Sequence, residues 1–138
     1  MDAKTARLTA KMDRRPGVSP QQLEAIFFPL NFTPPDDYVG FMTETNGSEG
    51  PIGTDRYLAI YSTEELLDRN AQTMTLEPGI LFFGSDRGGD GYAFELDTPS
   101  NEVVAVEFAD LDRTRARPMG KTFAEFLEML SSEGAAEP

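Results

Sequence analysis

Apolar residues recur every three or four positions in four segments of the chain, which is the spacing of a helix with one buried face. A residue that commonly caps helices precedes each segment; these residues are Ser19, Thr33, Ser62 and Thr122. The first two are followed directly by proline, which is well tolerated at the first position of a helix. The pattern therefore predicts helices over residues 20–28, 34–45, 63 to between 70 and 73, and 123–130.

Short apolar runs without helical spacing predict strands. Residues 57–61 and 80–83 are continuously apolar, which is typical of strands buried on both faces. Residues 92–96 and 102–108 largely alternate, and a turn at 98–101 joins them. Since short turns rather than crossover helices connect the last strands, we expect an α+β fold with a twisted, mostly antiparallel sheet and flanking helices.

The length of 138 residues suits a single domain, which we expect to span residues 19–130. Residues 1–18 are rich in Lys and Arg and are expected to form a flexible basic segment. Residues 131–138 are small and acidic, so we expect a disordered tail there. No run of residues is apolar enough for a membrane span or a signal peptide, which predicts a cytoplasmic protein.

Charge is distributed unevenly along the chain. The net charge is −12, and the first 20 residues hold five basic and two acidic residues, so the remaining 118 residues carry a net charge of −15. An acidic body repels nucleic-acid phosphates, which argues against direct nucleic-acid binding and favours core positions for the aromatic residues. It attracts a basic protein partner instead, although an acidic surface can also serve solubility alone.

The composition narrows the chemistry that the chain could perform. It contains no histidine and no cysteine, which excludes classical zinc sites and Ser-His or Cys-His nucleophilic pairs. No phosphate-binding loop or dinucleotide-binding glycine motif is present. What is left is carboxylate chemistry or a Ser/Lys pair, and only Lys121 lies outside the N-terminal segment. We therefore expect neither an enzyme nor a bound cofactor.

The glycine-rich stretch 84–91 is the first candidate site. Asp86 and Asp90 lie four residues apart and could chelate calcium, with Glu95 or Asp97 adding oxygen ligands. The stretch does not match the EF-hand pattern, so we favour a hairpin turn whose aspartates cap local N–H groups. A rigid turn would direct Asp86, Arg87 and Asp90 toward a partner.

Acidic residues near the middle of the chain form the second candidate site. Residues 47–53 are expected to form a loop because they contain three glycines and a proline. Glu49 in that loop, the nearby Asp55 and Glu44 at the end of the second helix could capture Lys or Arg side chains of a partner. The alternative is an ordinary solvated loop.

The order of these elements resembles the SMI1/KNR4 (SUKH) family over roughly residues 19–130. The resemblance is carried by the proline-initiated helix that ends at Asn46-Gly47, the loop 47–53, the strand leading into the helix capped by Ser62, the turn 84–91 before an aromatic strand, and the closing helix around 123–127. One departure is Ser48: the family pattern usually has a second glycine or an acidic residue directly after Asn-Gly, and here Ser48 precedes Glu49-Gly50.

The resemblance implies a non-catalytic protein-binding module. Bacterial members of the family resemble immunity proteins, so the implied partner is a cognate toxin domain, plausibly a basic nuclease whose active site the acidic face would occlude. The alternative is a regulatory or scaffolding adaptor without a toxin partner, as eukaryotic members resemble. The sequence does not identify the binding surface or the oligomeric state.

Overall fold

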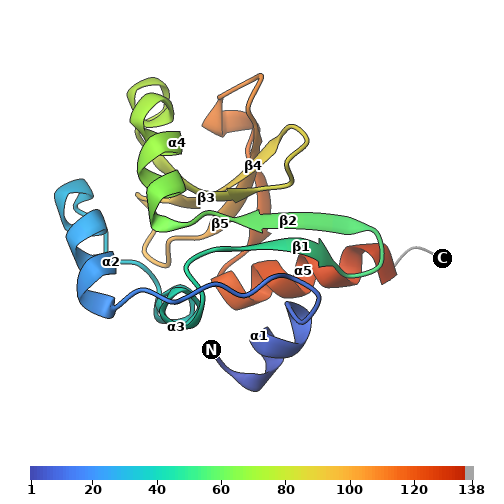
Figure 1. Ribbon diagram of the computed structural model, residues 1–138. Helices are drawn as coiled ribbons and strands as arrows, with labels where there is room; N and C mark the ends of the chain where they lie inside the picture. Colours follow the sequence, from blue (N-terminus) through green and yellow to red (C-terminus); the bar gives the residue numbers. More distant parts are fainter. Residues whose placement is uncertain (136–138) are drawn as a thin grey trace.

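Six antiparallel strands follow one another across a single sheet in the order in which they occur along the chain. The computed structural model describes residues 1–135 and is drawn in Figure 1. The strands are β1 (Ser48–Ile52), β2 (Arg56–Ile60), β3 (Ile80–Ser85), β4 (Asp90–Glu95), β5 (Val103–Glu107) and β6 (Arg117–Gly120). The α-helices are α1 (Ala3–Leu8), α2 (Pro20–Phe27), α3 (Asp36–Glu44), α4 (Thr63–Leu76) and α5 (Phe123–Ala135). Two short 3-10 helices, η1 (Phe28–Leu30) and η2 (Arg113–Arg115), complete the α+β fold that the sequence predicts.

The capping residues locate the starts of three of the four predicted helices. α5 begins at Phe123 as predicted, and the hydroxyl of Thr122 accepts from the Glu125 N–H at 3.0 Å. Ser19 and Ser62 both form complete capping boxes, in which the side chain of the third helical residue returns a hydrogen bond to the cap. The second predicted helix begins two residues later than expected, with Pro35 at its N-cap in an extended conformation. The prediction at Thr33 was wrong because Pro34 precedes another proline, and a residue in that position disfavours helical dihedral angles.

The sequence analysis did not predict β1 and β6. It expected a loop over residues 47–53, and this expectation was wrong because most of that range forms β1. Residues 48–52 form β1, which pairs with β2 from Ser48 opposite Ile60 to Ile52 opposite Arg56. Gly50 is buried in this strand because its α-carbon lies against the backbone of Met12, where an added Cβ would come within 2.9 Å. β1 and β6 are therefore held by backbone pairing, and neither shows an alternation of apolar side chains.

Residues 1–18, expected to be a flexible segment, contain α1 and pack on the domain. Figure 1 shows α1 beneath α5, and the side chains of Thr5, Thr9 and Met12 are buried. The chain then runs beside β1, where the N–H of Asp13 donates to the carbonyl of Glu49 at 3.0 Å. Threonines, backbone groups and a few apolar side chains such as Met12 make these contacts, and the segment has no regular apolar spacing that would predict them. At the other end, α5 continues to Ala135, and the remainder of the expected tail lies outside the described residues.

Aromatic rings fill the core between the sheet and the helices α3 and α5. Phe83 stacks on Phe94 with ring centroids 4.4 Å apart, and Phe126 meets Phe83 edge-on at 5.3 Å. Tyr38 of α3 is fully buried against Phe94 and Phe123, with centroids 5.2 and 5.4 Å away. The expectation that the aromatic residues serve the core is confirmed for these rings, whereas Phe28, Tyr57 and Phe108 are exposed.

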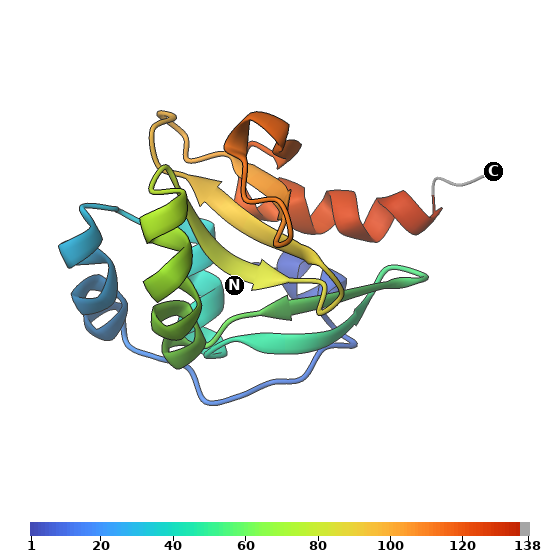
Figure 2. The same cartoon turned by 90° about the horizontal axis from the view of Figure 1, so that it is seen from above.

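The sheet is interrupted between β2 and β3, and a side chain fills the gap. β2 pairs with β3 only at Ala59 and Ile60, after which the chain turns into α4. The backbone of Phe82 consequently has no strand partner on that side. Asn70 of α4 takes its place: its Oδ1 accepts from the Phe82 N–H at 2.9 Å, and its Nδ2 donates to the Phe82 carbonyl at 2.8 Å. Figure 2 shows α4 held beside β3, and we call this pair of hydrogen bonds the Asn70 clamp.

Removing the Asn70 clamp should strongly destabilise the fold. Asn70→Ala leaves a buried N–H and a buried carbonyl of Phe82 unpaired, so we expect the free energy of unfolding to fall by about 2–4 kcal/mol. Urea denaturation followed by circular dichroism measures this loss. Thr75→Ala, an exposed position on the same helix, is the matched control and should change stability by about 0.5 kcal/mol or less. Equal effects from the two variants would contradict the role of the clamp.

In contrast to Asn70, Tyr38 carries a polar group whose removal should not destabilise the fold. Its hydroxyl is buried and finds no hydrogen-bond partner among the described residues, and burial raises the pKa of this phenol well above its usual range. Tyr38→Phe removes a desolvated polar group without changing the packing of the ring, so we expect the free energy of unfolding to stay level or rise by about 1 kcal/mol. A loss larger than about 1 kcal/mol in the same denaturation assay would show that the hydroxyl is hydrogen-bonded.

Candidate functional site

The turn between β3 and β4 is built around Asp86. Its Oδ1 accepts the N–H groups of Gly88 at 2.7 Å, Gly89 at 3.0 Å and Asp90 at 3.1 Å. Burial acts to raise the pKa of this carboxyl, but the hydrogen bonds outweigh it and hold the pKa below its ordinary value. Asp86 therefore has the turn-capping geometry that the sequence favours.

The geometry of the same turn gives the calcium alternative no support. The Oδ2 of Asp90 accepts from Nη2 of Arg117 at 2.6 Å, so the two aspartates are directed to different partners. Within residues 1–135 no three acidic side chains converge as a metal site would require. The hydrogen bond to Asp90 also raises the pKa of Arg117, as expected for an engaged guanidinium.

The side chain of Arg87 extends from the β3–β4 turn and forms ion pairs with two carboxylates from segments that are distant along the chain. Its Nη2 lies 3.0 Å from Oε1 of Glu49 on β1 and 2.9 Å from Oε2 of Glu65 on α4. Its Nε also donates to Oε2 of Glu49 at 3.3 Å. The backbone of Arg87 has a φ of 60°, an angle that is uncommon for residues other than glycine and asparagine. We call Arg87, Glu49, Glu65 and the neighbouring Tyr57 the Arg87 cluster.

The two carboxylates of the cluster are shared with other groups. Glu65 also accepts from the Ser62 N–H through Oε1 at 3.3 Å, so one side chain caps α4 and binds Arg87. Glu49 accepts from the Tyr57 hydroxyl at 2.7 Å. The hydrogen bond from Arg87 is the largest cause that lowers the pKa of Glu49, and the hydrogen bond from Tyr57 lowers it further. The bond to Glu49 in turn raises the pKa of the Tyr57 hydroxyl.

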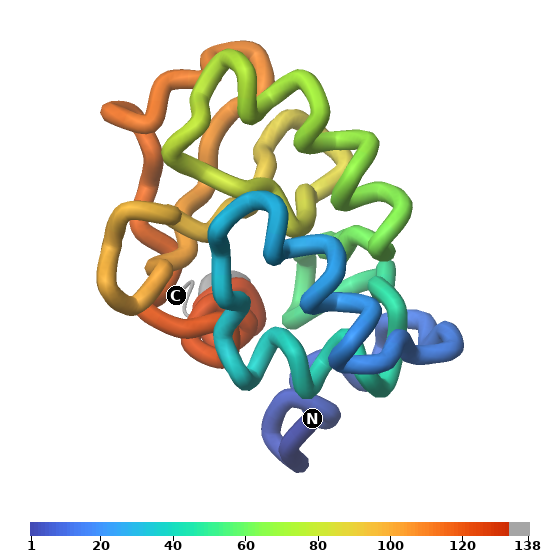
Figure 3. The backbone as a smooth tube through the Cα atoms, turned by 90° about the vertical axis from the view of Figure 1, so that its left-hand side faces the viewer, coloured from blue at the N-terminus to red at the C-terminus, as the bar shows by residue number. Residues whose placement is uncertain are grey.

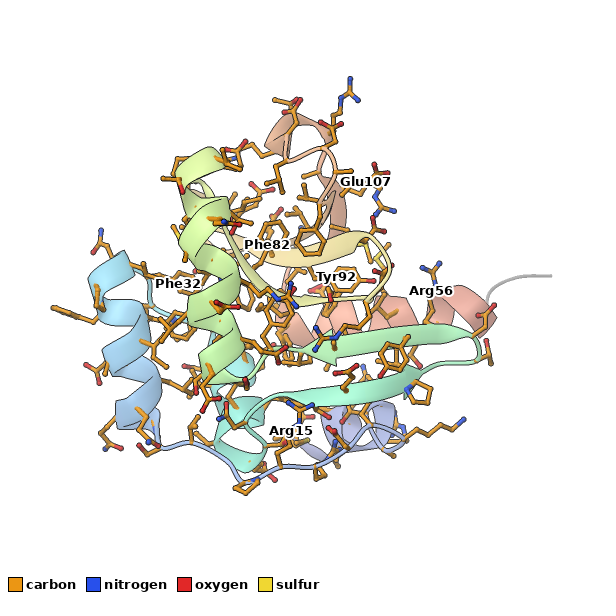
Figure 4. All side chains as sticks on the ribbon, turned by 45° about the horizontal axis from the view of Figure 1, so that its top comes forward. Arg15, Phe32, Arg56, Phe82, Tyr92 and Glu107 are labelled. Atoms are coloured by element: carbon orange, nitrogen blue, oxygen red, sulfur yellow. The ribbon has the colours of Figure 1, made fainter. Side chains whose placement is uncertain are left out.

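Further cations border the cluster. Nη2 of Arg15 lies 3.9 Å from Oε1 of Glu49, and Figure 4 shows Arg15 beside β1. Behind the cluster the buried ring of Tyr61 lies 5.9 Å from the guanidinium carbons of both Arg69 and Arg87. The carboxylates of the cluster are thus matched by cations of the same chain, and the cluster ties the N-terminal segment, β1, the β3–β4 turn and α4 together.

The six predicted partner-binding residues do not form one site. Glu49, Asp86 and Arg87 lie together, whereas Asp90 pairs with Arg117 on the far side of the turn. Glu44 pairs with the amino group of Met1 at the end of α3, and Asp55 is exposed between β1 and β2. A role of these residues in binding a partner stays a prediction.

Sequence analysis gave no role in a site to Glu65, Tyr57 or Arg15. Glu65 lies 22 positions from Arg87 along the chain, and Glu49 lies 38 positions from it. Neither pairing leaves a signal in local spacing. The one local hint is Arg87 itself, which occupies a turn position where glycine or asparagine is the usual residue.

The model of the SMI1 / KNR4 family (SUKH-1) matches residues 17–129 of the chain. The protein belongs to the SUKH-1 family. The matched range includes the six-stranded sheet, the Arg87 cluster and most of α5, and it begins after α1. No curated protein matches the chain. No helix within the described part of this SUKH-1 protein is long and apolar enough to cross a membrane. Membership of the family is consistent with a non-catalytic binding module.

The Arg87 cluster should contribute stability that depends on pH. Because the folded-state pKa of Glu49 lies below its unfolded value of about 4.3, this contribution is present above that pH and is lost as pH falls through the folded-state pKa. Arg87→Gln should lower the free energy of unfolding at pH 7 by about 1 kcal/mol, a discounted figure because the pair is partly exposed. The difference from the unmodified protein should shrink below about pH 4.

Chemical denaturation at a series of pH values measures this dependence. Arg115→Gln is the matched control, since Arg115 is 74% exposed and its ion pairs with Asp110 and Asp112 are screened by solvent. The control should change stability by less than Arg87→Gln at pH 7. A constant difference between Arg87→Gln and the unmodified protein from pH 7 to pH 3 would contradict the assignment of the effect to Glu49.

Proposed function

We propose that this protein is an immunity protein, which binds a cognate toxin domain in a stoichiometric complex and silences it. The observation that carries the proposal is the SUKH-1 family match over residues 17–129, which contains the whole six-stranded sheet, α2, α3, α4 and the beginning of α5. The function that this resemblance implies is protein binding without catalysis. The absence of histidine and cysteine from the sequence agrees with that reading, because the commonest catalytic bases and nucleophiles are missing.

The charge distribution supports a basic toxin, for which a nuclease is the most natural candidate. Residues 21–138 carry a net charge of −15, and several basic residues of the N-terminal segment are bound to acidic neighbours, as in the pair of Lys4 with Glu128. A nuclease holds nucleic acid in a cationic groove. An acidic protein that docks on such a groove would exclude the substrate, and long-range attraction would speed the encounter.

A rescue assay tests the proposed function. A candidate toxin domain, sought among the open reading frames beside this gene, is expressed in a sensitive host with and without the protein, and we expect growth only when the protein is present. The two chains should co-purify. An unrelated acidic protein of similar size and charge is the control, and it should neither rescue growth nor co-purify.

The salt dependence of toxin binding tests the electrostatic mechanism. Affinity measured by calorimetry should weaken by roughly tenfold or more between about 50 and 300 mM salt, because screening reduces attraction between the two charged faces. An affinity that is insensitive to salt would contradict the mechanism. A neighbouring gene product that is harmless, or that still kills in the presence of the protein, would instead favour a regulatory or scaffolding adaptor.

A further inference from the structure

An apolar groove of about 300 Å³ lies between α2 with η1 on one side and α4 on the other. Figure 3 shows these helices side by side on one flank of the molecule. Ile26, Phe27 and Leu30 line one wall. Leu66, Leu67, Ala71 and Met74 line the other, and Leu81 of β3 forms part of the floor. Asn70 is the only polar side chain among the residues that line the groove, and the Asn70 clamp already occupies its amide.

The exposed leucine of this groove is not needed for the fold. Leu67 is 56% exposed, although Leu66 beside it is buried in the core. Leu67, Ala71 and Met74 recur at helical spacing and form an apolar stripe along α4, in which Leu67 and Ala71 are exposed and Met74 is partly buried against the core. An apolar groove between two helices is the kind of surface that receives an amphipathic helix of a partner.

The charges around the groove indicate what it would bind. Glu64 and Asp68 are both exposed and lie one turn before Leu67 and Ala71 respectively, so they form an acidic row beside the apolar stripe. No charged residue lines the groove itself, so Glu64 and Asp68 would act from its outer border. A groove between two helices with an apolar floor and an acidic border complements a helix that has one apolar face and basic residues beside it.

We propose that the groove between α2 and α4 is the docking site for a basic amphipathic helix of the toxin, with Leu67 as its central contact. The inference rests on the proposed function, because it names the surface with which the immunity protein would hold its partner. It moves the binding surface away from the Arg87 cluster, whose carboxylates are already paired within the chain. The basic face of the helix would lie along Glu64 and Asp68.

Leu67→Glu is the decisive variant, and Leu76→Glu is its matched control. Both positions are exposed leucines on α4, but Leu76 is 70% exposed and lies outside the groove. The two variants make the same change in charge, so a long-range effect on a basic partner would be equal. We expect Leu67→Glu to weaken affinity for the neighbouring toxin domain by at least about tenfold, and Leu76→Glu to alter it by less than about threefold. Equal affinities for the two variants would overturn the inference and leave the proposed function standing.

A synthetic peptide separates failure of the inference from failure of the proposed function. An amphipathic helix of leucine and lysine, with all leucines on one face, is titrated into the isotope-labelled protein and followed by nuclear magnetic resonance. We expect shifts around Ile26, Leu67 and Met74, and their loss in Leu67→Glu. Shifts confined to other surfaces would overturn the inference. If the toxin does not bind at all but the peptide maps to the groove, the proposed function fails and the groove keeps its assigned ligand chemistry.

A second copy of this chain is the competing occupant. Sedimentation equilibrium of the unmodified protein at high concentration decides this point. We expect a monomer, because the groove would bind the toxin and not a second copy of the chain. A dimer that Leu67→Glu dissociates and Leu76→Glu preserves would overturn the inference, because the groove would then be filled by self-association.

Discussion

The structure depends on one side chain that completes the sheet where a strand is missing. β2 leaves β3 after two residue pairs, and Asn70 supplies the donor and the acceptor that the Phe82 backbone would otherwise lack. A buried unpaired peptide group costs about as much as a lost hydrogen bond, so the position of α4 is fixed at its middle by this requirement. Figure 4 shows Phe82 on β3 beside α4, at the centre of the molecule.

Two further contacts fix the beginning of the same helix. Asn46, which follows α3, accepts from the Thr63 N–H at 2.9 Å, and Glu65 reaches Arg87 on the β3–β4 turn. Because α4 is held at its beginning and at its middle, we expect it to form a rigid side of the groove. The turn of α4 that points Asn70 at the sheet leaves Leu67, Ala71 and Met74 on the adjoining face, toward α2. The contacts that complete the sheet thereby create a preformed groove, and a preformed groove lowers the entropy cost of binding.

The sequence predicts features encoded by neighbouring residues and misses those encoded across the chain. Capping boxes at Ser19 and Ser62 placed two helices because cap and partner are three residues apart. The Arg87 cluster could not be found in this way because its members are distant along the chain. β1 could not be found because its burial comes from the close approach of backbone at Gly50. Asn70 is the clearest case: an asparagine inside a helix has no local signature that distinguishes a solvent-facing residue from one that completes a strand.

The amide proton of Phe82 provides the most direct test of this account. Native-state hydrogen exchange reports the free energy at which each amide opens. If the Asn70 clamp anchors α4 to the sheet, the Phe82 amide will exchange only through global unfolding, with the same protection as the strand-paired amides at the centre of β4. Exchange at the rate of an open sheet edge would contradict the account, because α4 would then be free to move and the groove beside it would not be preformed.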